Sequence, residues 1–399
     1  MKKLLAFVLA LTMACGMMGC GSSSTASTTA AAETEAAETE AAEAAETEAA
    51  EAADAEEAAE TEAPEAVYGK KVAFLVNGNL GDKGFYDSCA EGVNRLASDY
   101  GCDVKIIEMG RDETTYETYF RDISEQDYDL IICCTFSVAD VLATVAADYP
   151  DQQYLYLDGS CDLENVTGVS YKSYETGFMA GALAALKVNE GGELIEEGNK
   201  TVGFIGSMDG SGINDFLVGY IEGIQYIDEE VKVITAYVGS YEDVATCLEM
   251  TTQLYNQGAQ IVYAPASQSI TGAVTASMNC NKYIIACDND IYTSTVDTDP
   301  DLVANVLSTS MKRMGDSVVW ASTGLWSEEL TVGENYTVGL AEGTVGLADN
   351  ANYQALVSQE TRDQLDEIAQ KIIDGEITID SAYVMEADDV AALRESVQP

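Results

Sequence analysis

Two patterns of apolar and polar positions alternate along the chain from residue 72 to residue 374. Short apolar runs predict buried strands, and longer stretches with apolar positions at helical spacing predict helices between them. The expected strands cover 72–76, 104–108, 128–135, 154–158, 166–170, 201–205, 231–238, 261–264 and 283–288. The expected helices cover 85–100, 115–125, 138–148, 174–187, 214–227, 244–256, 271–279, 302–322 and 360–374. Because the strands are almost continuously apolar and alternate with helices, we expect parallel sheets covered on both faces.

The alternation of strands and helices starts a second time near residue 201. In each half, the opening strand runs into a glycine-rich turn, at 77–84 and at 206–212. Ligands of open α/β sheets bind outside the carboxyl ends of the strands. The sequence therefore predicts an α/β protein of two similar lobes whose strand ends face each other across a ligand cleft.

The N-terminal part predicts export and attachment to a membrane. Residues 1–19 form a signal peptide, since two lysines precede an apolar run that is too short to span a bilayer. The run ends at Gly19-Cys20, which resembles a bacterial lipobox and implies a lipid on Cys20, with Cys15 as the alternative acceptor. Residues 20–66 then form an acidic, low-complexity tether or an interaction tail. We expect a protein that is lipid-anchored at the outer face of the cell membrane.

Composition excludes several functions. The chain has 69 acidic and 19 basic residues, a net charge of −50, so polymeric nucleic acid is excluded as a partner. Histidine is absent, which removes the commonest catalytic base and zinc ligand. We therefore expect no enzyme activity, no cofactor and no metal. The cysteines after residue 67 form no CxxC pair, and we expect them to be buried free thiols.

Acidic residues recur at the predicted strand ends: Asp82, Asp158, Asp288 and Asp290. Each one alone could instead be a helix cap or a turn residue. Ionised carboxylates only accept hydrogen bonds, so such a group suits a neutral ligand that is rich in hydroxyl or N–H donors and repels phosphate. The basic Lys312 follows them and is either a site residue or a surface lysine.

One aromatic residue lies just past a predicted strand end in each half. Phe85 follows the first glycine-rich turn, and Tyr241 follows the strand 231–238. Two such rings could enclose a flat ligand, and stacking contributes on the order of 0.5–1.5 kcal/mol per pair beyond burial. Either ring alone could belong to the core.

Several short motifs in a fixed order carry a resemblance to a known family. They are VAFLV at 72–76, DKGF at 82–85, YLYLD at 154–158, YETGFMAGALA at 174–184, TVGFIG at 201–206, YVGSYED at 237–243, DND at 288–290, SMK at 310–312, GLAEG at 339–343 and KIIDGEI at 371–377. With these motifs, the chain resembles the basic membrane protein family, the PnrA-like nucleoside-binding lipoproteins of ABC transporters, from residue 71 to about residue 382.

The resemblance implies a type I periplasmic-binding-protein fold, with two Rossmann-like lobes of parallel strands joined by three crossovers. We expect residues 67–172 and 291–335 in the N-terminal lobe, and 173–290 and 336–399 in the C-terminal lobe. The resemblance also implies a monomeric substrate-binding protein of an ABC importer, which binds a nucleoside, expected to be a purine nucleoside, and delivers it to permease subunits.

Individual roles follow from the same resemblance. Phe85 would stack on one face of the base and Tyr241 on the other, while Asp82 and Asp158 would bind the base edge or nearby hydroxyls. Asp288 with Lys312 would bind the ribose, and Asp290 lies beside them. The chain departs from the family pattern at Tyr86, where Asn is usual, and at Ser267, where Gly is expected; both are candidate ligand residues. Tyr241 itself replaces Phe.

Two alternatives stay open. Strand-end carboxylates bind hydroxyls of any origin, so the ligand could be a sugar or another small polar solute. The chain could also be a surface adhesion or regulatory lipoprotein that keeps the fold but has no transport role.

Overall fold

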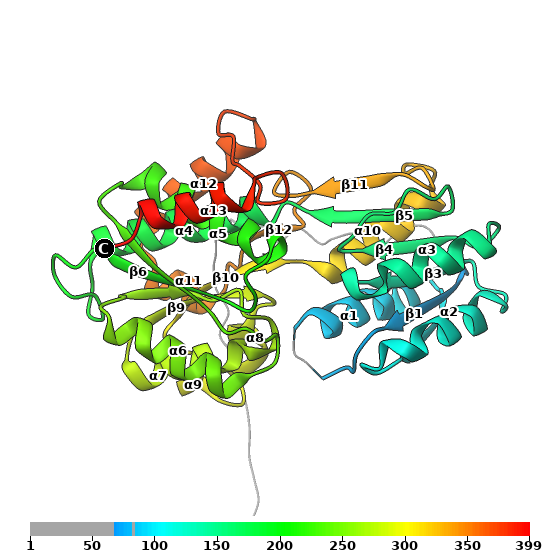
Figure 1. Ribbon diagram of the computed structural model, residues 1–399, viewed down its shortest axis with the longest axis horizontal. Coiled ribbons are helices and arrows are strands. Elements are labelled where there is room, and N and C mark those ends of the chain that lie inside the picture. Colours follow the sequence, from blue (N-terminus) through cyan, green and yellow to red (C-terminus); the bar gives the residue numbers. More distant parts are fainter. Residues whose placement is uncertain (1–67, 82–83) are drawn as a thin grey trace, which may run out of the picture. The chain divides into compact units, whose positions relative to one another are not determined.

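The computed structural model describes residues 68–81 and 84–399. The expected signal peptide, Cys20, the tether and Asp82 lie outside the described residues. The described chain contains two sheets of six strands each, shown in Figure 1.

The first sheet has the strand order β11-β5-β4-β3-β1-β2, and all of its strand pairs are parallel. Its strands are β1 (Lys71–Val76), β2 (Asp103–Glu108), β3 (Leu130–Cys134), β4 (Tyr154–Leu157), β5 (Val166–Tyr171) and β11 (Asn335–Val338). The helices that pack on this sheet and on one another are α1 (Phe85–Ser98), α2 (Tyr116–Ser124), α3 (Ala139–Asp148) and α10 (Met314–Trp326).

The second sheet has the order β12-β10-β9-β8-β6-β7, and only its short edge strand β12 is antiparallel. Its strands are β6 (Thr201–Gly206), β7 (Lys232–Tyr237), β8 (Ile261–Tyr263), β9 (Tyr283–Asp288), β10 (Val306–Lys312) and β12 (Val345–Leu347). Its helices are α4 (Ser173–Glu190), α5 (Ser211–Ile227), α6 (Val244–Asn256), α7 (Ile270–Cys280), α8 (Ile291–Thr295), α9 (Pro300–Val303), α11 (Ala351–Leu356), α12 (Gln359–Ile373) and α13 (Ala387–Ser396). No helix within the described ranges is long and apolar enough to cross a bilayer.

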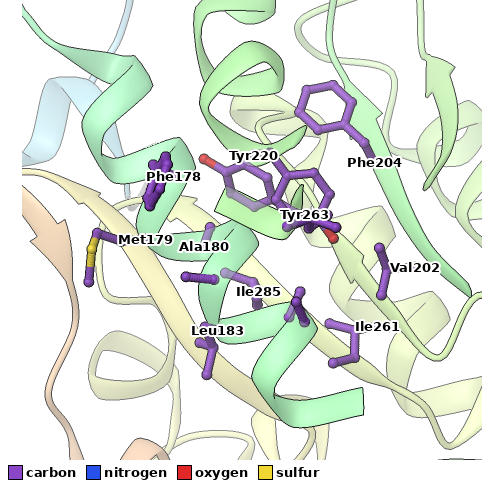
Figure 2. Packing of buried hydrophobic residues seen from close by; sticks show 14 of the residues in the cluster. Phe178, Met179, Ala180, Leu183, Val202, Phe204, Tyr220, Ile261, Tyr263 and Ile285 are labelled. Carbon is purple, nitrogen blue, oxygen red and sulfur yellow. The ribbon is translucent and has the colours of Figure 1, made fainter. Parts of the chain in front are cut away.

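Both faces of each sheet are buried, as the apolar strands predict. Val72 and Phe74 of β1 enter one core cluster, while Ala73 and Leu75 enter another on the opposite face. In the second sheet, Figure 2 shows the cluster under α4 and α5, where the rings of Phe204, Tyr220 and Tyr263 pack with centroids 5.1 to 6.1 Å apart. Burial on two faces explains why these strands read as continuous apolar runs.

The chain passes between the sheets at three places: Lys172 between β5 and α4, Arg313 between β10 and α10, and residues 339–344 between β11 and β12. These passes confirm the predicted fold of two parallel-sheet lobes joined by three crossovers. The second and third passes lie at other positions than expected. β10 belongs to the second sheet, although residues 291–335 were predicted to lie in the N-terminal lobe. β11 belongs to the first sheet, although most of it falls within residues 336–399, which were predicted to lie in the C-terminal lobe.

The predicted helix 302–322 is wrong, because β10 interrupts it. Ser308, Thr309 and Ser310 are fully buried in this strand. Ser308 Oγ donates to the carbonyl of Ala348, and Ser310 Oγ bonds the Tyr263 hydroxyl at 2.8 Å. Small hydroxyl residues thus occupy positions where an apolar residue signals a strand, and the partners of Ser308 and Ser310 come from distant segments.

Helices α4 and α5 approach each other through glycine. Gly177 and Gly181 lie one turn apart on α4, and Gly219 and Gly223 do so on α5. A Cβ atom added at any of the four would overlap the backbone of the other helix. Because only glycine permits this approach, the two helices form a tightly packed pair on the second sheet.

We expect Gly219→Ala to lower the free energy of unfolding by about 1–3 kcal/mol, since an added methyl group must push the two helix backbones apart. Urea denaturation would measure the change. Gly210→Ala is the matched control: no atom lies within 4 Å of its added Cβ, so the cost should stay below about 1 kcal/mol. Equal effects of both substitutions would contradict the proposed close packing.

Candidate functional site

The strand ends of both sheets hold polar residues in a left-handed backbone conformation. Thr135 follows β3 with φ 70°, Asp158 follows β4 with φ 61°, Ser267 lies past β8 with φ 52°, and Asp288 ends β9 with φ 72°. Such conformations cost on the order of 1–3 kcal/mol each in non-glycine residues and cluster at functional sites. Asp158 and Asp288 follow the fourth strand of their respective lobes, so the two acids occupy equivalent positions.

Lys312, the last residue of β10, joins the two lobes by an ion pair. Its Nζ donates to Asp158 Oδ1 at 2.7 Å, although β10 and β4 belong to different sheets. The Lys312 side chain is 9% exposed and that of Asp158 is 29% exposed. The rings of Tyr171, Phe216 and Phe85 have centroids 5.1, 5.9 and 6.0 Å from Nζ, a distance typical of cation–π contacts.

Opposing effects set the pKa of Lys312. Burial lowers it, but the carboxylates of Asp158 and Asp288 raise it more strongly, so that the pKa lies above its ordinary value. The side chain is therefore an ammonium ion at any physiological pH. An ammonium has three N–H donors, so it can bind Asp158 and an oxygen atom of a solute at the same time. We call Lys312, Asp158, Asp288 and Phe85 the Lys312 cluster.

Tyr86 lies in the core rather than in the Lys312 cluster. Its ring packs edge-on against Phe85, with centroids 5.5 Å apart, and beneath Gly78. Its hydroxyl donates to the carbonyl of Asn77 at 3.2 Å. Any influence of Tyr86 on the ligand would therefore act through the position of Phe85 or the shape of the first glycine-rich turn.

Tyr241 faces the ring of Phe136, a residue that the strand-end pattern had not been used to predict. Phe136 directly follows the strained Thr135 and is 72% exposed, while Tyr241 is 40% exposed. Their ring centroids lie 6.4 Å apart at an angle of 42°. Phe136 comes from the first lobe and Tyr241 from the second, so the aromatic contact between the lobes is made by this pair.

The structure places Ser267 and Asp290 in supporting positions. Ser267 opens a short 3-10 turn (Ser267–Ser269), and the backbone N–H of Ser269 donates to the carbonyl of Tyr241 at 3.1 Å. Asp290 is the N-cap of α8 and accepts from the backbone N–H of Thr293 at 3.2 Å and from Asn350 Nδ2 at 2.9 Å. Asp290 is thus a helix cap, which was the alternative interpretation of each strand-end acid.

Comparison with known proteins fits this geometry. Residues 69–382 match the family described as ABC transporter substrate-binding protein PnrA-like. The chain belongs to this family. Basic membrane protein A of Borreliella burgdorferi is 26% identical to it over 322 residues, which cover 78% of this chain and 88% of that protein.

Solved structures show the same fold. The solute-binding protein of an ABC transporter system from Aeropyrum pernix K1 superposes with a TM-score of 0.68 and 22% identity, covering 83% of this chain and 100% of that chain. A second such protein, from Conexibacter woesei DSM 14684, has a TM-score of 0.64 and 19% identity, covering 78% and 99%. This PnrA-like protein is therefore a substrate-binding protein of the ABC transporter class, a class that binds small solutes and works with permeases.

A second ion pair of the PnrA-like protein also connects the lobes. Arg111, three residues past β2, has its Nη1 2.5 Å from Glu242 Oε1, and its Nη2 donates to Gln268 Oε1 at 3.0 Å. These three side chains, Val244 and residues 79–81 line a hollow of about 490 Å³. The hollow shares no lining residue with the Lys312 cluster. Arg111 and Glu242 both lie just past strand ends, so a search for charged residues of either sign at these positions would have selected them.

Asp215, on α5, is a buried carboxylate that the sequence pattern does not reveal. It accepts hydrogen bonds from Ser381 Oγ at 2.6 Å and from the backbone N–H groups of Ala382 and Tyr174 at 3.0 and 3.1 Å. Burial raises the pKa of Asp215 from 3.8 to about 6, although these three donors act in the opposite direction. The Asp215 carboxylate thus connects the start of α4 to the segment before α13 by hydrogen bonds.

The described part of the PnrA-like protein shows no group of three or more His, Cys, Asp or Glu residues that could hold a metal ion. Its cysteines are free, and most of them are buried: Cys89, Cys102, Cys133, Cys134, Cys247 and Cys287. The expectation of buried free thiols is confirmed for these residues.

We expect Lys312→Met to lower the free energy of unfolding by about 1–3 kcal/mol, because it leaves the Asp158 and Asp288 carboxylates without their common cation. Urea denaturation would measure it. Lys71→Met removes an exposed ion pair to Asp127, with side chains 50% and 102% exposed, and should change stability by less than about 1 kcal/mol. A Lys312→Met variant as stable as the wild type would contradict the role of the buried ammonium.

Asp215 should make stability dependent on pH. Between about pH 4 and pH 6 the folded chain holds a proton on Asp215 that the unfolded chain has lost, so the free energy of unfolding falls as the pH rises. A pKa shift of about two units corresponds to about 3 kcal/mol. Relative to Asp215→Asn, which does not titrate, the wild type should lose about 2–3 kcal/mol between pH 4 and pH 7.5 in urea denaturation. A difference independent of pH would show that the donors keep Asp215 ionised.

Proposed function

We propose that this protein is a lipid-anchored substrate-binding protein at the outer face of the cell membrane, which binds a ribonucleoside between its lobes and delivers it to an ABC permease. The observation that carries the proposal is the Lys312 cluster. A buried ammonium, two carboxylates at equivalent strand ends and an aromatic ring meet where the strands of both sheets end.

The chemistry of the Lys312 cluster favours a neutral solute with hydroxyl groups and a flat ring. Asp158 and Asp288 accept hydrogen bonds from O–H or N–H groups, and Lys312 donates to oxygen atoms. A ribonucleoside offers the hydroxyl pair of ribose, N–H groups on the base and a π face. A phosphate group would meet two carboxylates and a single ammonium that is already paired with Asp158, so nucleotides are disfavoured.

Aromatic residues would hold the base. Phe85, beside Lys312, would stack on one face, and Tyr241 with Phe136 would close over the other. A purine has the larger ring system and would gain more from such stacking. Asp82 would add a hydrogen bond to the base edge or to a nearby hydroxyl. Ser267 would act indirectly, because the short turn that it opens bonds the backbone of Tyr241.

Closure between the lobes would explain capture of the solute. The ion pairs Lys312–Asp158 and Arg111–Glu242 both join residues of different sheets. A solute that contacts both lobes binds the closed arrangement more tightly than the open one, and so shifts the population towards it. A permease could then distinguish the loaded protein from the empty one by its shape.

Attachment to the membrane rests on the sequence before residue 67. Cys20 follows a signal peptide in a lipobox-like context, and the acidic tether separates it from the folded lobes. Two acyl chains suffice for stable anchoring, whereas one gives only reversible binding.

We expect inosine, guanosine or adenosine to raise the melting temperature of the full-length chain, because a solute that binds only the folded state stabilises it. A thermal-shift panel of nucleosides, free bases and sugars would measure this. If no nucleoside shifts the melting temperature, the nucleoside proposal is overturned. If only a sugar does so, the site belongs to a sugar-binding protein.

Asp288→Ala should weaken binding of the best nucleoside by about ten- to a hundredfold in isothermal titration calorimetry, since loss of a hydrogen-bond acceptor that the bound solute covers costs about 1–3 kcal/mol. The control is Asp127→Ala, whose carboxylate is fully exposed on the first lobe. Equal affinities of the two variants would show that the solute binds elsewhere.

A further inference from the structure

We propose that Tyr383 contacts the bound solute at the Lys312 cluster, and that the buried carboxylate of Asp215 positions it there. This inference rests on the proposed function and extends it, because it adds a third segment of the chain to a site so far built from the ends of the two sheets. The residues that match the family end at 382, immediately before Tyr383.

The turn that carries Tyr383 is fixed by hydrogen bonds. Asp215 accepts from Ser381 Oγ at 2.6 Å and from the backbone N–H of Ala382 at 3.0 Å. The carbonyl of Ser381 accepts from the backbone N–H groups of Val384 and Met385 at 3.0 and 3.2 Å. Ala382 is itself buried against Val218 of α5. The backbone on the N-terminal side of Tyr383 is therefore attached to α5.

The side chain of Tyr383 reaches the second glycine-rich turn. Its Oη lies 3.2 Å from the position that a Cβ atom on Gly212 would take. Gly212 lies in the first turn of α5, three residues before Asp215 and four before Phe216, whose ring faces the Lys312 ammonium. The same turn of helix thus anchors the backbone of the Tyr383 turn, accommodates its hydroxyl and contributes a ring beside Lys312.

The charges of the Lys312 cluster act on the Tyr383 hydroxyl. The protein atoms around the hydroxyl shield it from water and raise the pKa of Tyr383, although most of the side chain is exposed, and among the nearby groups Asp158 raises the pKa further while Lys312 lowers it. Tyr241 and Asp215 also raise it. The hydroxyl is therefore protonated at neutral pH and can both donate and accept a hydrogen bond. Of these neighbours, Asp158, Lys312 and Tyr241 are residues that the proposed function assigns to the solute.

The exposure of the Tyr383 ring also favours contact with a ligand. Tyr383 is 62% exposed, so its ring contributes little to the core, yet its backbone is held by a buried carboxylate. A large aromatic side chain that is exposed beside charged groups, and carried on a backbone already held in place, gains much when a solute covers it. A tyrosine offers such a solute an apolar face and a polar hydroxyl on one side chain.

Isothermal titration calorimetry on the full-length chain with inosine, guanosine and adenosine tests the inference. We expect Tyr383→Phe to weaken binding about three- to tenfold, as expected for one hydrogen bond, and Tyr383→Ala to weaken it more than tenfold. The matched control is Tyr226, an exposed tyrosine on the far end of α5; Tyr226→Phe and Tyr226→Ala should bind within twofold of the wild type.

The role of Asp215 requires a double-mutant cycle. Asp215→Ala should weaken nucleoside binding in the wild-type background but have no further effect in the Tyr383→Ala background. A merely structural role would weaken binding equally in both backgrounds and would overturn the positioning claim. If Asp215→Ala does not fold, Asp215→Asn, which keeps one acceptor oxygen, takes its place in the same cycle.

The outcomes separate the two claims. A wild-type chain that binds none of the nucleosides overturns the proposed function, and the inference with it. A wild type that binds, together with Tyr383→Phe and Tyr383→Ala variants of unchanged affinity, overturns the inference alone.

Discussion

The burial of one ammonium ion constrains the centre of this protein. Lys312 is almost fully removed from water among aromatic rings, and a buried charge is tolerated only when it is paired. Its partner, Asp158, belongs to the other sheet, so the pairing requires the ends of β4 and β10 to face each other. Asp158 makes this ion pair from a left-handed backbone conformation, with φ 61°. The atoms that stabilise this ion pair are thus the same ones to which the proposed function assigns the solute.

Most of the fold could be predicted from the sequence, because strands that are buried on two faces appear as continuous apolar runs. The failure at β10 has a physical reason. Ser308, Thr309 and Ser310 are all buried, and the hydroxyls of Ser308 and Ser310 bond partners far along the chain, which no local pattern encodes. Because β10 was predicted to be part of a helix, the second crossover was expected near residue 291 instead of at Arg313. The acidic strand ends Asp158 and Asp288 were found because they follow recognisable strands.

The remaining candidate site residues show which positions a local sequence pattern can predict and which it cannot. Phe136 follows β3 as Phe85 follows the first turn, so the same rule covers it. Asp290 satisfied the rule but caps α8, since a carboxylate that has an N–H group within three residues tends to bind it. Tyr383 lies far from any strand end in sequence, and the long-range contact between Asp215 and Ser381 attaches its turn to α5. Residues placed by tertiary contacts could not be predicted from periodicity.

The position of β11 affects how the chain can be made. The first sheet begins at residue 71 but receives its outer strand only from Asn335–Val338, after most of the second lobe. A ribosome therefore releases β5 long before the strand that covers its edge, and an uncovered edge can pair with another chain. Neither lobe is a continuous segment, so neither can be completed early, and both are finished within the same late stretch of synthesis. The interleaving of the two lobes along the chain thus also leaves the nascent chain prone to wrong strand pairing until β11 has been made.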